Sequence, residues 1–523
     1  MILSSGCLFG ADAYRARESG RRVKVRASLR YDVAIIGAGA DGLAAAALLA
    51  RAKLSTIVIE RHERCGGRAA TREFHPGFRA SPFADEIPPI PANLHWALDL
   101  SRRGAIFLPA PLSTALWPDR SSVIRRGSFS PASHLLKQAT DTAEAVCRHA
   151  EIHSEIAARS WPRMLGRKRA SEPWPAAASA TTSLSESIGA AVPDADDAAH
   201  VCAVALWGGA ADPFLAGTAL HLLAAGRSGT IMGGLERLAD ALIAAATEGG
   251  AEIRCGLEAS EIRMADGRAT IVVLADGTEI EARAVISTLD LRRSFLSLFK
   301  WNELPAPLLN RIRNFRMAGA TARLLLALDG PPDSLAGLGE ALRGPIHLAP
   351  DFETAAQAYA AWCGGLIPAA PPLVLRVVST TDPSLAPVGG ATITVTAGCI
   401  PHRLFDGAWT HARRQELRAK LLARIDQTLP GVSSHIVGAE LIVPPDIEEQ
   451  IGATEGDLCG GELAADQMLD LRPGFEGATG ARTPIRGFYL AGPSTAVGPL
   501  ATGAAGAIAA ATVLADFKAG RLR

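Results

Sequence analysis

The chain has 523 residues, which is too long for a single ordinary domain, so two or three domains are expected. Lysine and arginine together number 53, and aspartate and glutamate also number 53, so the net charge is zero and a general nucleic-acid-binding surface is not expected. No run of eighteen strongly apolar residues occurs, and we expect no membrane-spanning helix.

Residues 1–30 differ in composition from the rest of the chain. They are rich in lysine and arginine and lack the apolar core of a signal peptide. We therefore expect a basic N-terminal arm that is disordered.

Residues 31–68 have the pattern of a dinucleotide-binding βαβ unit. Gly37 would make the tight turn, Gly39 would let the backbone approach a pyrophosphate, and Gly42 would let the helix pack closely on the strand. The N-terminus of the helix would offer free N–H groups to the phosphates, and Glu60 would accept hydrogen bonds from a ribose. In chain order the parts are an apolar strand at 33–36, the three glycines, an Ala/Leu-rich helix, a second apolar strand at 56–59, and Glu60.

Two adjacent glycines shortly after the second strand indicate which dinucleotide is bound. Gly66-Gly67, followed by Arg68, stands where flavoproteins of the glutathione-reductase type carry a GG motif, which NAD-dependent dehydrogenases do not need. An ordinary turn is the alternative interpretation of these glycines alone. FAD is therefore the expected cofactor. The candidate cofactor-binding residues of this segment are Gly37, Ala38, Gly39, Ala40, Asp41, Gly42, Glu60, Arg61, Gly67 and Arg68.

Two later segments carry elements typical of the same domain. The first has an amphipathic helix at 233–242, a strand at 251–254, a hairpin-like pair at 269–274 and 279–282, and a buried strand at 284–288. The second has a strand at 488–492 that ends in glycine, and a small-residue helix at 502–517.

These elements predict an α/β fold with two units. The first is an FAD-binding Rossmann-like domain of the glutathione-reductase type, and the second is an inserted α+β substrate domain. We assign 31–120, 225–300 and 475–523 to the FAD-binding domain, and 121–224 and 301–474 to the substrate domain.

The eight cysteines indicate a reducing compartment. They form no CxxC pair and no His/Cys cluster with zinc spacing. We therefore expect small core cysteines, no metal site and a cytoplasmic protein, and the missing CxxC pair argues against a dithiol reductase.

Over nearly all of residues 31–515, the chain resembles the phytoene desaturase-like (carotenoid desaturase/isomerase) family of FAD-dependent oxidoreductases. Within that family it is most similar to the branch that includes pyridine nucleotide-disulphide oxidoreductase domain-containing protein 2. The resemblance rests on four motifs in order: VAIIGAGADGL with the continuation ERHERCGGRAATREFHPGFR, then GTIMGGLERLADAL, GDLCGGELAADQMLDLRP and GFYLAGPSTAVGPLATGAAGAIAA.

The resemblance implies roles for residues outside the first motif. Leu257 would present its backbone to the adenine, and Gly492 would approach the ribityl-phosphate end. The helix from Thr502 would direct its N-terminus at the N1–C2=O side of the flavin, where reduced flavin carries negative charge. Leu500, in the loop before this helix, is a further candidate cofactor-binding residue.

The sequence departs from the family pattern in three places. The C-terminal loop of the family is usually glycine-dense, whereas here it contains Pro499 and Leu500. The usual histidine of the branch, in its GNIFHG-like stretch, is matched by Gly460. Asp41 stands where that branch often has asparagine, which places a carboxylate near a phosphate site.

Three functional hypotheses follow. The first, implied by the resemblance, is an FAD-dependent dehydrogenase, desaturase or isomerase-like enzyme with a role in carotenoid biosynthesis, which acts on an apolar polyene or isoprenoid by hydride transfer to flavin N5. The second is a flavin amine oxidase-like enzyme, although GPSTAVGPLATG lacks the aromatic residue usual there. The third, motivated by Pro499 and Leu500, is a catalytically impaired FAD-binding protein with a binding or assembly role. No Ser/His/Asp constellation or spaced carboxylate pair identifies a catalytic residue.

The sequence gives weaker indications of partners. Because no second GxGxxG motif is visible, oxygen or a quinone is the expected electron acceptor rather than NAD(P)H. The basic segment 159–174 is flanked by tryptophans and suggests a peripheral membrane contact, with a solvated loop as the alternative. The sequence does not indicate an oligomeric state.

Overall fold

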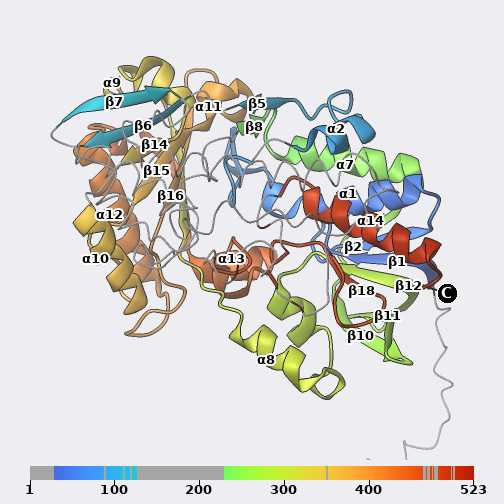
Figure 1. The fold of residues 1–523 in the computed structure, drawn as a ribbon. Coiled ribbons are helices and arrows are strands. Elements are labelled where there is room, and N and C mark those ends of the chain that lie inside the picture. Colours follow the sequence, from blue (N-terminus) through green and yellow to red (C-terminus); the bar gives the residue numbers. More distant parts are fainter. Residues whose placement is uncertain are drawn as a thin grey trace, which may run out of the picture.

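Two seven-stranded sheets organise the part of the chain that the structure, a computed structural model, describes (Figure 1). Our predictions for the basic arm up to residue 28, for segment 159–174 and for Leu500 fall outside that part. The described residues are 29–87, 90–109, 112–117, 120–126, 229–348, 352–462, 467, 472–473, 475, 481–495, 498 and 501–522.

The first sheet is the predicted dinucleotide-binding sheet. Its strands run in the order β10-β11-β12-β1-β2-β9, with β18 paired to β12. The pairs β1–β2, β1–β12, β2–β9 and β12–β18 are parallel, so the carboxyl ends of these five strands lie at one edge, where such sheets bind nucleotides. The strands are β1 (Leu29–Ile36), β2 (Thr56–Ile59), β9 (Glu252–Arg254), β10 (Ala259–Ala265), β11 (Arg268–Leu274), β12 (Glu279–Ser287) and β18 (Phe488–Leu490).

One prediction for this sheet was wrong. The segments 279–282 and 284–288 were expected to be two strands, but β12 is a single strand that pairs with β1 along most of its length. Between the two expected segments lies Arg283, whose exposed side chain donates hydrogen bonds to the Leu522 carbonyl (2.9 Å) and to Asp32 (3.0 Å). An outward-facing arginine is compatible with a strand, because alternate side chains point to opposite faces. Strand β10 was not predicted.

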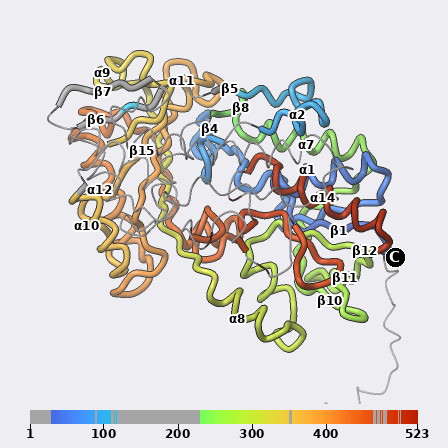
Figure 2. The backbone as a smooth tube through the Cα atoms, in the orientation of Figure 1, coloured from blue at the N-terminus to red at the C-terminus, as the bar shows by residue number. Residues whose placement is uncertain are grey.

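Three helices cover one face of the first sheet: α1 (Ala40–Arg51), α7 (Glu236–Gly249) and α14 (Ala504–Lys518) (Figure 1). Helix α1 touches both others, and its buried side chains are mostly alanine, which allows the backbones to approach closely. Helix α14 begins two residues later than predicted. Figure 2 shows blue, green and red segments, from three separate parts of the chain, side by side in this unit.

The opposite face of the first sheet has its own core. Phe295, Phe299 and Phe488 pack with ring centroids 5.0–6.0 Å apart, in edge-to-face and stacked arrangements. Helix α8 (Ala306–Asn314) adds Leu308 and Ile312 to the same cluster. The dinucleotide-binding sheet is therefore buried on both sides, as a mainly parallel sheet requires.

The second sheet belongs to the other unit and has the order β17-β13-β16-β15-β14-β6-β7. Its outer face is apolar and packs against α12 (His411–Thr428), whose Leu417, Leu421 and Ile425 are buried. Helix α10 (Phe352–Cys363) lies on the same side (Figure 1). The strands are β6 (Leu112–Trp117), β7 (Arg120–Arg126), β13 (Ala322–Leu328), β14 (Ile346–Leu348), β15 (Leu373–Val377), β16 (Ala391–Ala397) and β17 (Ile436–Ile442).

The strand pairing moves one predicted domain boundary. Strand β6, residues 112–117, pairs with β14 and therefore belongs to the second sheet, although we had assigned residues up to 120 to the FAD-binding domain. Short elements lie between the two units: the hairpin β3 (Arg72–His75) and β4 (Phe78–Ala80), the pair β5 (Phe107–Pro109) and β8 (Gly229–Ile231), α11 (Val378–Thr381) and α13 (Pro444–Ile451). Helix α2 (Ala92–Ala97) packs on the core of the first unit through Leu94.

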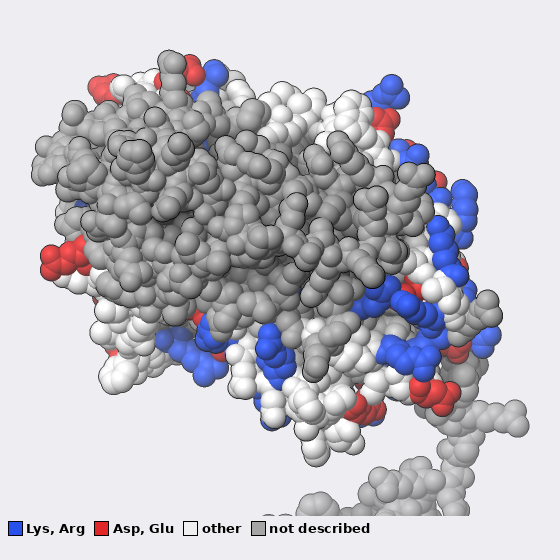
Figure 3. Space-filling view, in the orientation of Figure 1, with Lys and Arg blue, Asp and Glu red and all other residues white. Residues whose placement is uncertain are grey.

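The surface of the described residues is of mixed charge. Basic and acidic side chains both occur along the rim that is visible in Figure 3. Two ion pairs of mixed charge at the surface of the described residues are Arg103 with Glu248 and Arg263 with Glu279. None of the helices in the described ranges is long and apolar enough to cross a membrane.

Candidate cofactor and substrate site

The glycine loop between β1 and α1 is shaped as the sequence predicted. Gly37 has a φ of +99°, and its N–H donates to the Ile59 carbonyl at 2.8 Å. A β-carbon on Gly42 would lie 2.0 Å from the Gly37 carbonyl oxygen, so only glycine permits this helix-to-loop contact. A β-carbon on Gly39, in contrast, would meet no atom within 4 Å. The backbone at Gly39 therefore faces open space at the N-terminus of α1, where the helix offers N–H groups to an anion.

Glu60 lies at the carboxyl end of β2, beside this loop. It is buried, and its carboxylate accepts hydrogen bonds from the Ala38 N–H (2.8 Å) and the His62 N–H (3.0 Å). The Leu257 N–H donates to the Glu60 carbonyl at 2.8 Å, which brings the predicted adenine-contacting residue next to the predicted ribose-binding acid. Arg61 is directed elsewhere, because its guanidinium donates to the Glu449 carbonyl in α13 at 2.9 Å.

The GG motif contacts the glycine loop directly. The Gly66 N–H donates to the Ala38 carbonyl at 2.9 Å, and Gly66 forms a parallel bridge with Gly39. A β-carbon on Gly67 would lie only 3.3 Å from the Gly39 Cα. This packing explains why two small residues are needed here, and it supports the interpretation as a second cofactor-contacting loop over that of an ordinary turn.

Asp41 joins the N-termini of two helices. It lies in the first turn of α1, and its carboxylate accepts from the Gly506 N–H of α14 at 3.4 Å. A β-carbon on Gly506 would lie 1.7 Å from the Asp41 carbonyl oxygen, so the two helices touch through their backbones. Burial raises the pKa of Asp41 to about 6, while hydrogen bonds from α14 and the charge of Arg68 act in the opposite direction. The N–H groups that we had assigned to the flavin are therefore directed at a carboxylate of this chain.

The C-terminal motif meets the first loop at Thr288, a contact residue that the sequence did not single out. A β-carbon on Gly37 would lie 2.2 Å from the Thr288 hydroxyl, and one on Gly492 would lie 2.4 Å from the Thr288 carbonyl oxygen. Gly492 thus permits close packing of strand ends. The hydroxyl of Thr502, at the start of α14, is buried and finds no hydrogen-bond partner among the described residues. Buried hydroxyls normally have a partner, so Thr502 suits a ligand atom.

The position of the family histidine is filled by packing. Gly460 has a φ of +62°, and a β-carbon there would lie 2.6 Å from Pro493 Cγ. Pro493 itself follows Gly492 in the C-terminal motif. A histidine at 460 could therefore not be accommodated without moving Pro493.

The residues fit FAD. Open space at Gly39, the helix N-terminus behind it, a buried acid at the end of β2 and an unpartnered hydroxyl at Thr502 lie along one sheet edge, as a dinucleotide requires. Ala38 and Ala40 flank Gly39 without side chains that would fill the space. The charge of Arg68 acts on Asp41 and also interacts with Asp457 and Cys459.

The face of the second sheet that is turned toward the first unit is polar. Arg323 on β13 forms a two-pronged ion pair with Asp85 (2.7 and 2.5 Å), and Arg376 on β15 pairs with Glu86 at 2.6 Å. All four side chains are no more than 5% exposed. Sequence reasoning missed both pairs, although an arginine inside an otherwise apolar strand is a usable signal for a buried ion pair.

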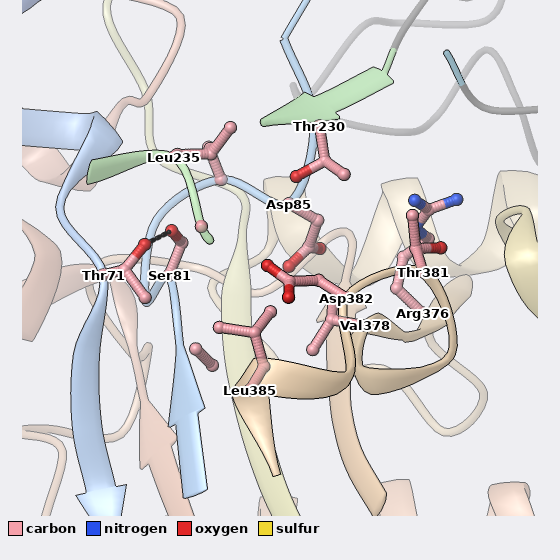
Figure 4. A pocket seen from close by; sticks show the side chains of 13 residues that line it. Thr71, Ser81, Asp85, Thr230, Leu235, Arg376, Val378, Thr381, Asp382 and Leu385 are labelled. Atoms are coloured by element: carbon pink, nitrogen blue, oxygen red, sulfur yellow. Dashed lines mark hydrogen bonds between the residues drawn. The ribbon is translucent and has the colours of Figure 1, made fainter. Parts of the chain in front are cut away.

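A pocket that is partly open to solvent lies between the units (Figure 4). Asp382 lines it and accepts from the Gly233 N–H (2.6 Å) and the Ser384 hydroxyl (2.7 Å), while none of the ion pairs of the described residues involves it. The Thr71 and Ser81 hydroxyls are hydrogen-bonded to each other at 2.9 Å on the opposite wall. Seven of the thirteen lining residues have polar side chains, namely Thr71, Ser81, Asp85, Thr230, Arg376, Thr381 and Asp382, and the other six are Ala80, Ala84, Gly234, Leu235, Val378 and Leu385.

Comparisons with known proteins agree with this geometry. The model of the flavin containing amine oxidoreductase family matches residues 42–385. A pyridine nucleotide-disulfide oxidoreductase domain-containing protein 2 from Rattus norvegicus is 27% identical over 93% of this chain and 94% of its own length. A 4,4'-diapolycopene oxygenase from Methylomonas sp is 28% identical over 50% of each chain. The structure of a cyclohexylamine oxidase from Brevibacterium oxydans IH-35A superimposes with a TM-score of 0.58 and 16% identity, covering 93% of this chain and 99% of that one, and shows the shared fold.

Proposed function

The chain belongs to the flavin containing amine oxidoreductase family, uses FAD, and resembles phytoene desaturase-like enzymes, and from these premises we propose that it oxidises a C–H bond of a small organic molecule held between the two sheets. The observation that carries the proposal is the open space at Gly39, framed by the N-terminus of α1 and by Glu60. When bound, FAD supplies the electron acceptor, because the flavin N5 takes up a hydride.

The chain's own residues would hold the dinucleotide and exclude water. Gly39 and the first N–H groups of α1 would face the pyrophosphate, and Glu60 would exchange its backbone hydrogen bonds for ribose hydroxyls. Thr502 would gain its missing partner. Two side chains that line the pocket, Asp85 and Arg376, are held by ion pairs with Arg323 and Glu86, which would keep an oriented substrate in place.

The substrate class is the finer part of the proposal. An apolar polyene or isoprenoid is the class that the resemblance implies, and the partial similarity to a diapolycopene oxygenase supports it. The polar residues among those that line the pocket, Asp382 in particular, instead support a substrate with a polar or cationic group near its reacting carbon. Amine oxidation is therefore the second candidate, favoured by the carboxylate of Asp382, which has no cationic partner among the described ion pairs. Oxygen or a quinone is the proposed acceptor.

The first test concerns the cofactor. We expect Gly39→Val to abolish FAD retention without unfolding the protein, because the added side chain enters open space where the cofactor would lie, and the extended backbone (φ −72°, ψ 175°) suits valine. The measurement is the flavin absorption of purified protein together with its thermal midpoint. Gly330→Val is the matched control, since its nearest neighbour is 3.7 Å from the new β-carbon. Full flavin content in Gly39→Val would refute the cofactor assignment.

The second test separates the substrate classes. Anaerobic mixing of the flavin-loaded protein with a polyene, an isoprenoid alcohol and a set of primary amines should bleach the flavin band for one class. Bleaching by amines that is weakened in Asp382→Asn would favour amine oxidation, and bleaching by polyenes alone would favour a desaturase. A flavin that none of these substrates reduces would support a binding or assembly role instead.

A further inference from the structure

Two cysteines that are 190 positions apart in the sequence meet at the end of the first sheet. The Sγ atoms of Cys65 and Cys255 lie 3.4 Å apart, within the range of an S–H···S contact. Cys65 lies between β2 and the GG motif, and Cys255 follows β9 directly. Both are only half-buried, so a small solute can reach them. The sequence did not suggest this pair, because no CxxC spacing marks it.

The two thiols lie beside the predicted adenosine end of the cofactor site. Gly66, the neighbour of Cys65, donates to the Ala38 carbonyl of the glycine loop at 2.9 Å. Leu257, two residues after Cys255, donates to the Glu60 carbonyl at 2.8 Å. A change in the separation of the two sulfurs would therefore act on both walls of the nucleotide site.

We propose that Cys65 and Cys255 form a reversible disulfide that locks the nucleotide end of the cofactor site. The oxidant is a peroxide. One thiolate attacks a peroxide oxygen and becomes a sulfenic acid, and the second thiol attacks that sulfur and releases water, so that two thiols and one hydrogen peroxide give one disulfide and two waters. A disulfide bond of about 2.05 Å requires the sulfurs to approach each other by about 1.4 Å.

The disulfide would tether the segment after β2 to the segment after β9. These segments carry Glu60 and Leu257, and exchange of a buried dinucleotide requires such segments to separate. The tether should therefore slow both uptake and release of FAD. This consequence rests on the proposed function, since it places FAD between those segments, and reoxidation of the flavin by oxygen would also supply the peroxide. Burial, Cys255 and Glu60 together raise the pKa of Cys65 to about 12, so disulfide formation should accelerate as the pH rises.

The experiment treats purified flavin-loaded protein with hydrogen peroxide and follows thiols and flavin separately. We expect the thiol count after denaturation to fall from eight to six, and unreduced digests to contain the linked Cys65 and Cys255 peptides. The fluorescence of the free cofactor measures the release of FAD. We expect this release to slow by about tenfold or more and to return to its original rate with dithiothreitol. A tenfold change corresponds to about 1.4 kcal/mol in the barrier.

Cys65→Ser and Cys255→Ser should each abolish the linked peptide and the slow release. Cys363→Ser, at an exposed thiol elsewhere, should retain both and is the matched control. The proposal is overturned if the flavin-loaded protein gives no linked peptide, or if the linked protein releases FAD at the unmodified rate. Failure of the proposed function can be told apart from failure of this proposal. A protein that binds no FAD would show no change in FAD release, but the linked Cys65 and Cys255 peptides could still be detected.

Discussion

Asp41 shows how one residue can set the electrostatics of the cofactor site. Its carboxylate lies at the N-terminus of α1, where a pyrophosphate is expected, and accepts a hydrogen bond from α14. An anion at a helix N-terminus is stabilising, but it competes there with any other anion. The side chain is buried enough to raise its pKa to about 6, so part of the population holds a proton under mildly acidic conditions.

Asp41→Asn should stabilise the FAD-free protein at neutral pH. Because the folded state raises the pKa of this acid from 3.8 to about 6, its contribution favours folding below pH 4 and is lost as the pH rises through 6. This pKa shift corresponds to a loss of at most about 3 kcal/mol in the free energy of unfolding at pH 7. Asparagine removes the ionisation and retains the oxygen that accepts from Gly506. Urea unfolding at several pH values would measure this, and the difference between variant and wild type should shrink toward pH 4.

The same substitution should tighten FAD binding at pH 7 and above. Removal of the carboxylate relieves its repulsion from the pyrophosphate, whereas at pH 5 the wild-type acid is already largely protonated. Titration of the FAD-free protein with FAD at both pH values provides the measurement. Equal affinities of Asp41→Asn and wild type at pH 8 would show that the pyrophosphate lies elsewhere.

At the scale of elements, contact between helix backbones positions the site. Helices α1 and α14 touch where a β-carbon on Gly506 would lie 1.7 Å from a carbonyl oxygen, so their spacing depends on that glycine. The high alanine content of both helices has the same consequence along their length. A small change in side-chain volume at this contact would displace the N-terminus of α14 from the glycine loop.

Gly506→Ala should destabilise the protein, although alanine is the better helix former. The added methyl group forces the helices apart, and overpacking of this kind typically costs about 1–3 kcal/mol, partly offset by about 1 kcal/mol of helix propensity. Ala515→Gly, at a half-buried position of the same helix, serves as the control and should cost only the propensity term. Thermal unfolding and flavin content together test this, and an unchanged midpoint would contradict the close packing.

The first sheet was largely predictable from the sequence, and the reason is local. Its apolar strands, the glycine spacing after 33–36 and the acid at 60 are continuous motifs whose physical roles can be read directly. The second sheet was not predicted strand by strand, because its strands pair across long intervals and contain arginines and threonines that face the other unit. For the same reason, contacts between distant residues escaped prediction: Cys65 with Cys255, Asp85 with Arg323, and Asp41 with α14.

At the scale of the whole molecule, buried ion pairs connect the two units. Asp85 and Glu86 lie on the segment after the β3–β4 hairpin, and Arg323 and Arg376 lie on strands of the second sheet. The Arg323 guanidinium also contacts the Thr396 hydroxyl and the Pro82 carbonyl. This network fixes one unit relative to the other along the wall of the pocket in Figure 4.

Arg323→Leu should destabilise the protein by about 3–5 kcal/mol, because it leaves the Asp85 carboxylate buried without its partner. The double variant Arg323→Leu, Asp85→Leu should regain most of that loss, since no charge then remains uncompensated. Urea unfolding of the single and double variants gives the coupling energy. Arg263→Leu, whose exposed pair with Glu279 lies on the surface, is the control and should change stability by less than about 1 kcal/mol.

Strand β18 and helix α14 have a consequence for how the protein is made. Strand β18 pairs with β12 and α14 packs on α1, so both complete a unit whose first strand, β1, begins at residue 29. A ribosome nevertheless produces them after almost all the other described residues. The face of α1 that α14 covers must therefore remain exposed until these late residues have been made. The coenzyme site is complete only after that point.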